Sequence, residues 1–241
     1  RQCFVHAGDE IAALGKADAI LMRHLLITHG LDLSVAGGGD IVEHIGRVMH
    51  GRVDPARGFD TYLDQIEEVM THAGLADAAV CGVSFGGLVA LHWAARRPER
   101  TRALVLVSTP SPNWKPAARV DWYLRAPRLL APVFAAQSPF RLGPEIWRAH
   151  DSVGDRLAFS GRQVARVALS PFSPVGMAER VRLMSTVDFE ADCRRVRAPT
   201  LVLTGEPGLD RVVSVDGTRS YTDRIAGAHH AILERTGHIG L

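Results

Sequence analysis

The residues best suited to chemistry lie in a Gly-x-Ser-x-Gly pattern formed by Gly82, Ser84 and Gly86. A short apolar run precedes this pattern, and a run rich in alanine and leucine follows it. A nucleophilic serine is typically held in a strained turn between a strand and a helix, where flanking glycines avoid backbone collisions. The pattern and its context therefore predict that Ser84 is a nucleophile.

A serine hydroxyl is a weak nucleophile until a base, usually histidine, removes its proton and a carboxylate orients that base. The chain offers both groups downstream of Ser84. Asp210 lies in a turn-rich loop after the apolar run 200–204, and His238 follows the run 230–234. Loops at the carboxyl ends of parallel strands meet at one edge of a sheet. Asp210 and His238 are therefore a candidate acid and a candidate base.

The elements that must position these residues are those of an α/β protein. Short, apolar, β-branched runs predict buried parallel strands, and these runs are residues 25–28, 79–83, 103–108 and 200–204. Residues 87–97 end before Pro98 and predict a helix that completes a β-α-β unit around Ser84. Apolar residues at helical spacing predict another helix over 62–73.

The segment 110–187 has a different composition from the rest of the chain. It contains nine of the 13 prolines and three of the four tryptophans, and it has no strand-like run. These features predict short helices interrupted by proline, which form a cap inserted into a core made of residues 1–109 and 188–241. The segment holds ten arginines and one lysine against five acidic residues. This positive charge either attracts an anionic substrate or lies on solvated helix faces.

Composition narrows the class of partner. The chain has 241 residues, 28 basic and 26 acidic side chains and a net charge of +2, a balance that argues against nucleic-acid and membrane-surface binding. Its three cysteines are far apart, which argues against a disulfide framework and a zinc site. No signal peptide or membrane-spanning run is apparent. We expect a cytoplasmic protein that binds a small molecule; its oligomeric state is not predicted.

The order and spacing of four motifs resemble those of the α/β-hydrolase superfamily, in its branch of capped esterases, lactonases and haloperoxidase-like proteins. The motifs are His29-Gly30 after a strand, Gly82-Val-Ser-Phe-Gly86, the loop 205–210, and Gly237-His238. The resemblance covers residues 25–241. It implies an α/β fold with a mostly parallel, doubly wound sheet and an inserted helical cap.

By this resemblance, Ser84 is the nucleophile, His238 is the general base, and Asp210 is the acid that fixes the tautomer of His238. The oxyanion hole comprises the backbone N–H groups of Phe85 and Leu31. The implied function is cleavage of a small, largely apolar carboxylic ester, thioester or lactone through an acyl-enzyme, with no cofactor and no metal. The substrate-binding residues would be His29, Gly30, Trp114, Trp122 and Phe134, although the three aromatic residues could instead pack the cap on the core.

Other residues compete for the roles of acid and base. Glu206 and Asp216 flank Asp210 in the sequence, and Ser108 ends a strand that carries the acid in some relatives. The chain has eleven histidines, of which His238 follows the last expected strand. These positions favour Asp210 and His238 and leave the alternatives open.

Two regions depart from the family pattern. The region 31–58 is altered, because only residues 40–49 lie between its glycine run and the loop that follows, too few to hold both a helix and a further core strand comfortably. The sequence also ends three residues after His238, where relatives continue into a helix. Two alternative hypotheses therefore stand beside hydrolysis. The first is a truncated or altered copy that is catalytically impaired or non-catalytic. The second is an acyltransferase or a cofactor-free peroxidase that uses the same triad.

Overall fold

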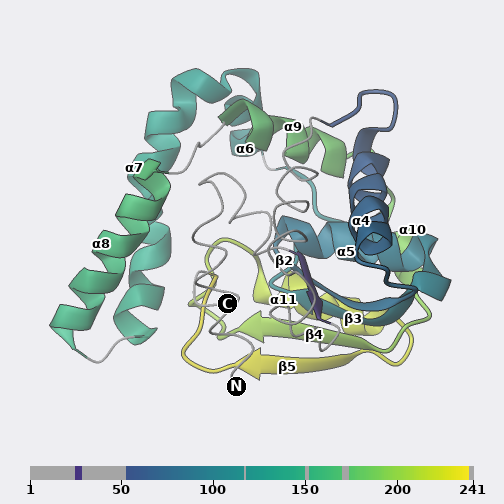
Figure 1. Ribbon diagram of the computed structural model, residues 1–241. Helices are drawn as coiled ribbons and strands as arrows, with labels where there is room; N and C mark the ends of the chain where they lie inside the picture. The colour runs from purple at the N-terminus through teal and green to yellow at the C-terminus, as the bar shows by residue number, and fades with distance from the viewer. Residues whose placement is uncertain (1–24, 29–52, 117, 150–151, 170–173, 239–241) are drawn as a thin grey trace.

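The computed structural model describes residues 25–28, 53–116, 118–149, 152–169 and 174–238 (Figure 1). In this part of the chain, five strands form one sheet in the order β1-β2-β3-β4-β5. The strands are β1 (Leu25–Thr28), β2 (Ala78–Val83), β3 (Thr101–Val107), β4 (Thr200–Gly205) and β5 (His229–Leu233). Strands β2 to β5 are parallel. The mostly parallel sheet predicted from the sequence is therefore confirmed.

The direction of β1 differs from the prediction. A strand is present over Leu25–Thr28, but it runs antiparallel to β2, with Leu25 opposite Gly82 and Thr28 opposite Ala79. An apolar, β-branched run indicates a strand, yet the composition of four residues does not encode the direction of pairing. The prediction of a parallel strand here was wrong. Because Thr28 is paired with Ala79, β1 ends at the edge of the sheet where β2 begins and not at the edge where β2 ends.

The helices that flank the sheet come from both halves of the chain. A 3-10 turn (η1, Gly58–Asp60) leads into α4 (Thr61–His72), and α5 (Phe85–Arg96) connects β2 to β3 through a second 3-10 turn (η2, Pro98–Arg100). Helix α10 (Phe189–Arg195) precedes β4 and packs against α5, which also contacts β2 and β3. Residues 86–95 of α5 are all buried, so this helix forms the centre of the core.

A short helix fixes the segment that follows the Asp210 loop. Helix α11 (Val215–Arg219) and a 3-10 turn (η3, Ser220–Asp223) lie between β4 and β5. The Thr218 hydroxyl donates to the carbonyl of Thr109 at 2.7 Å, and the Tyr221 hydroxyl donates to the carbonyl of Pro110 at 2.6 Å. Both acceptors follow the end of β3, so these bonds tie the loop after β4 to the loop after β3.

The segment 110–187 is helical, but its helices differ from those predicted. They are α6 (Ala118–Arg125), α7 (Pro127–Ala149), α8 (Val153–Leu169) and α9 (Pro174–Met184). Helices α7 and α8 contact each other and lie side by side in Figure 1. Helix α7 continues for 23 residues through Pro132, Pro139 and Pro144. The prediction that proline keeps these helices short was wrong for α7: proline removes a backbone donor and disfavours a helix, but here the helix continues past each one.

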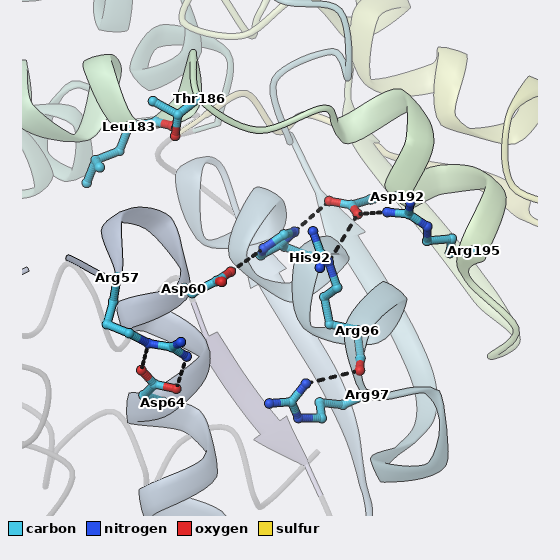
Figure 2. Close-up of polar contacts among 10 residues, drawn as sticks. All are labelled: Arg57, Asp60, Asp64, His92, Arg96, Arg97, Leu183, Thr186, Asp192 and Arg195. Carbon is cyan, nitrogen blue, oxygen red and sulfur yellow. Dashed lines mark hydrogen bonds and ion pairs between the residues drawn. The ribbon is translucent and has the colours of Figure 1, made fainter. Parts of the chain in front are cut away.

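A polar cluster centred on the buried His92 joins η1, α5 and α10 (Figure 2). The Nδ1 atom of His92 lies 2.6 Å from Asp192 Oδ2, and its Nε2 atom lies 2.8 Å from Asp60 Oδ1. His92 and Asp192 are almost fully buried. The hydrogen bond with His92 is the main cause that holds the pKa of Asp60 below its usual value. These two contacts join three separate segments of the chain around one buried imidazole.

We expect Asp192→Ala to lower the free energy of unfolding by about 3 kcal/mol, because it leaves His92 buried without one of its partners. Denaturant unfolding at pH 7 measures this loss. The matched control is Asp64→Ala, which removes an exposed ion pair with Arg57 and should change stability little. Equal effects of the two substitutions would contradict a structural role for the buried cluster.

No helix among the described residues is both long and apolar enough to cross a membrane.

Candidate active site

Ser84 occupies the turn between β2 and α5 in a strained backbone conformation. Its φ is 54° and its ψ is −124°, a combination that costs a residue with a side chain about 1–3 kcal/mol. The N–H of Ser84 donates to the carbonyl of Val107 at 2.9 Å, and the N–H of Gly87 donates to the carbonyl of Ser84 at 3.0 Å. Strand β3 and the first turn of α5 therefore hold this conformation, which raises the serine above the end of its strand.

Two glycines make the turn possible. A Cβ atom at Gly82 would lie 2.2 Å from the carbonyl oxygen of Gly86, and one at Gly87 would lie 1.9 Å from Thr109 Oγ1. No side chain fits at either distance. The close approach of β2 to the first turn of α5 thus explains the glycine at position 82 of the Gly-x-Ser-x-Gly pattern.

We expect Gly82→Ala to destabilise the protein by about 3 kcal/mol, since the new methyl group meets backbone atoms that cannot move without displacing α5. The matched control is Gly161→Ala in α8, where a Cβ atom meets nothing within 4 Å. That substitution should raise stability by about 0.5–1 kcal/mol because alanine favours the helix. Thermal unfolding of the two variants measures both effects, and a shift of the same sign in both would contradict the packing argument.

Asp210 and His238 form a hydrogen-bonded pair after β4 and β5. The Nδ1 atom of His238 lies 3.2 Å from Asp210 Oδ2. The other carboxylate oxygen, Oδ1, accepts the N–H groups of Val212 and Val213 at 2.9 Å each. The Asp210 carboxylate is buried, whereas the His238 side chain is 15% exposed. A carboxylate on Nδ1 leaves Nε2 available for proton transfer.

The surroundings of Asp210 favour its ionised form. Burial acts to raise the pKa of its carboxyl group, but hydrogen bonding and charge from His238 and the N–H of Val213 outweigh burial and lower the pKa. Ser108, whose buried hydroxyl directly follows β3, also acts to lower the pKa of this carboxyl group. Asp210 is therefore an anion at neutral pH, as an orienting acid must be.

The parallel sheet places Ser84 at the same edge as this pair. Val83 is paired with Val107, Val107 with Leu203, and Gly205 with Leu233, so these strands end together. The two downstream loops also touch, because the N–H of Glu206 donates to the carbonyl of Thr236 at 2.9 Å. Within the described part of the chain, no hydrogen bond joins Ser84 to His238. Such catalytic contacts are often long without substrate and tighten when it binds.

The other acidic candidates, Glu206 and Asp216, have no hydrogen bond with His238 among the described residues. Glu206 Oε1 accepts the N–H of Arg235 at 2.7 Å, and Asp216 is in the first turn of α11. Of the four candidates named from the sequence, Asp210 is the one hydrogen-bonded to His238. The geometry therefore favours Asp210 over Glu206, Asp216 and Ser108 as the orienting residue.

The structure describes one of the two predicted oxyanion donors. The N–H of Phe85 belongs to the first turn of α5, where backbone donors have no partner within the helix. Leu31, His29 and Gly30 lie outside the described residues, and so does the side chain of Phe134. Their roles stay predictions.

The aromatic residues predicted to bind substrate are not enclosed. Trp122 on α6 is 58% exposed and Trp114, after β3, is 37% exposed. A depression of about 500 Å³ lies along α4, where it is lined by Asp64, Glu67, Glu68, Thr71 and His72. It shares no residue with the candidate site. Binding of substrate by the tryptophans stays a prediction.

Sequence reasoning missed Glu145, a buried residue of α7 whose carboxylate accepts the N–H of Gly237 at 2.9 Å. The available signal was weak, since Glu145 is one of five acidic residues in the arginine-rich segment 110–187. Among the residues that the structure describes, no group of three or more histidine, cysteine or acidic side chains is arranged to hold a metal.

A comparison with known protein families finds a match over most of the chain. A family model described as the alpha/beta hydrolase fold matches residues 46–241. Among curated proteins, the putative carbamate hydrolase RutD of Stutzerimonas stutzeri (strain A1501) is 30% identical over 178 residues, which are 72% of this chain and 64% of that protein. The putative carbamate hydrolase RutD of Azorhizobium caulinodans is 25% identical over 171 residues, 67% of this chain and 60% of that protein. The chain thus spans less than two thirds of the length of these relatives.

Solved structures share the fold at lower identity. A hydrolase from Pseudomonas aeruginosa PA01 superposes with a TM-score of 0.57 at 24% identity, over 73% of this chain and 63% of that chain. The enol-lactonase from Burkholderia xenovorans LB400 superposes with a TM-score of 0.54 at 22% identity, over 76% of this chain and 68% of that chain. At these identities the likeness concerns the fold alone.

Proposed function

Because the chain belongs to the alpha/beta-hydrolase family, we propose that it is a serine hydrolase that cleaves a small, largely apolar carboxylic ester, thioester or lactone. One observation carries the proposal. A serine in a strained turn after β2 lies at the sheet edge where the buried Asp210 carboxylate is hydrogen-bonded to His238. This arrangement supplies a nucleophile, a base and an orienting acid.

In the proposed reaction, Ser84 Oγ attacks the carbonyl carbon of the substrate while its proton moves to Nε2 of His238. The negative charge that forms on the carbonyl oxygen is stabilised by the N–H of Phe85. Collapse of this intermediate breaks the bond between the acyl carbon and the alcohol or thiol, which takes the proton from His238. In a lactone this hydroxyl stays attached to the acyl group. Water then attacks the acyl-enzyme with the same base, and the acid product leaves as Ser84 regains its proton.

A carbamate is the second candidate substrate, because both curated relatives described above are named as putative carbamate hydrolases. A carbamate carbonyl can be attacked by the same serine, so the two substrate classes need the same catalytic groups. The choice between them depends on the groups that surround the scissile carbonyl. Transfer to another acceptor than water, or cofactor-free peroxidation, would also use this triad.

Steady-state hydrolysis of p-nitrophenyl esters from acetyl to octanoyl, beside a p-nitrophenyl carbamate, tests the proposal. If the acyl site is apolar, kcat/KM should rise by roughly fourfold for each added methylene until the site is full. A flat series would contradict the apolar site, and a higher kcat/KM for the carbamate would favour the second candidate. No hydrolysis of any of these compounds by folded protein would contradict the proposed activity.

A further inference from the structure

Glu145 is a buried acidic residue near the end of α7, with 1% of its surface exposed. Its Oε1 atom accepts the N–H of Gly237 at 2.9 Å. Gly237 directly precedes His238, the candidate base. A side chain from the helical segment 110–187 therefore holds the backbone next to that base, although it comes from a position 92 residues earlier in the chain.

The packing around Gly237 leaves little freedom for this loop. A Cβ atom at Gly237 would lie 2.6 Å from Glu145 Cδ and 2.8 Å from the carbonyl oxygen of Leu209. Leu209 directly precedes Asp210. Gly237 is thus enclosed between the Glu145 carboxylate and the loop that carries Asp210. Glu145 therefore packs the loop that carries His238 (the histidine loop) against the loop that carries Asp210.

Weaker contacts surround this buried one. The guanidinium of Arg235 donates to the carbonyl of Arg148 at 3.3 and 3.4 Å, and the Arg148 guanidinium lies 4.0 Å from Glu206 Oε2. These side chains are largely exposed or at long range, where such contacts contribute little. The hydrogen bond of Glu145 is made in a buried setting, where a lost acceptor costs more. Glu145 is therefore the residue of α7 whose removal should displace the histidine loop most.

We propose that Glu145 is a positioning residue for His238, which makes the reaction depend on the docking of α7. This inference rests on the proposed function, since it gives Glu145 a role through the general base. A displacement of about 1 Å in a catalytic group can lower the rate by about 100-fold. A residue that served stability alone would change the fraction of folded protein and leave kcat per folded molecule unchanged.

The test compares Glu145→Ala, Glu145→Asp and Glu145→Gln with wild type. Alanine removes the acceptor, aspartate keeps the charge but retracts the carboxylate by one methylene, and glutamine keeps an acceptor carbonyl at the same reach. We expect alanine and aspartate to lower kcat by roughly 10- to 100-fold with KM changed less than about threefold. Glutamine should restore kcat to within about fivefold of wild type, because a neutral acceptor retains part of the bond. Glu179→Ala, an exposed glutamate of α9, is the matched control and should leave both constants unchanged.

The rate of covalent labelling of Ser84 by a fluorophosphonate, measured on protein shown by circular dichroism to be folded, separates the two proposals. Slower labelling of the alanine or aspartate variant, with rescue by glutamine, supports the role of Glu145. If wild type and a folded alanine or aspartate variant are labelled at the same rate, the role of Glu145 is overturned while the serine hydrolase proposal stands. A glutamine variant that is labelled as slowly as the alanine and aspartate variants also overturns the role of Glu145. A folded wild type that takes up no label overturns the proposed function, and the role of Glu145 with it.

Discussion

Replacement of Ser84 by alanine is expected to lower kcat for ester hydrolysis by about a millionfold, and replacement of His238 by alanine by a similar factor. Each change removes one of two groups that act only together: without Oγ no acyl-enzyme forms, and without the imidazole the proton of Oγ has no acceptor. The double variant should therefore be no slower than either single variant. Steady-state rates with p-nitrophenyl esters measure these losses.

Circular dichroism and denaturant unfolding of the same variants supply the control. Backbone hydrogen bonds with Val107 and Gly87 hold Ser84 in its turn, and bonds at Thr236 and Gly237 hold the loop before His238. Both variants should therefore retain the wild-type spectrum. A folded Ser84→Ala protein that keeps more than a small part of its activity would show that another group attacks the substrate. Multiplicative losses in the double variant would show that the serine and the histidine act separately.

Asp210→Asn is expected to lower kcat by about ten-thousandfold while the fold is retained. The amide can still accept the N–H groups of Val212 and Val213, which hold the loop. Its amide N–H, however, faces Nδ1 of His238 and favours the tautomer whose Nε2 atom carries the proton. That tautomer cannot accept the proton of Ser84. Steady-state kinetics at neutral pH measure the loss, and a fall of less than about tenfold would contradict the orienting role of Asp210.

The lowered pKa of Asp210 also sets how stability depends on pH. A carboxyl group whose pKa is lower in the folded chain stabilises that chain above its usual pKa of 3.8, and this stability is lost as pH falls through the lowered value. We therefore expect wild type to be more stable than Asp210→Asn at pH 7 and the difference to shrink below pH 3.8. Unfolding by urea across this range measures the difference. A difference that grows with acidification would contradict the assignment.

The sequence predicted much of the sheet and of the candidate site because local signals there agree with the fold. Gly82 and Ser84 indicate a tight turn. In the structure, a Cβ atom added at Gly82 would lie only 2.2 Å from the carbonyl oxygen of Gly86. Asp210 and His238 follow apolar runs that form adjacent parallel strands, so their order alone predicts that their loops meet. In these regions the local pattern and the order of the strands are enough to predict the arrangement.

Other features depend on contacts between distant parts of the chain. The direction of β1 is not encoded in the four residues Leu25–Thr28. Proline at 132, 139 and 144 predicts helix ends, but α7 continues past all three. Glu145 becomes significant only when α7 docks on the loop of Gly237, and no local pattern indicates that contact. Local patterns therefore predict Ser84, Asp210 and His238 as candidate site residues but do not predict Glu145, whose contact depends on the packing of α7.

The most direct test of the central claim is to incubate the folded wild-type chain with a fluorophosphonate and to locate the label by mass spectrometry. The account predicts one label per chain, attached to Oγ of Ser84, and none on Ser84→Ala. It also predicts that His238→Ala labels far more slowly, because the base no longer activates the hydroxyl. A folded wild-type protein that takes up no label, or that carries it on a residue other than Ser84, would contradict the account.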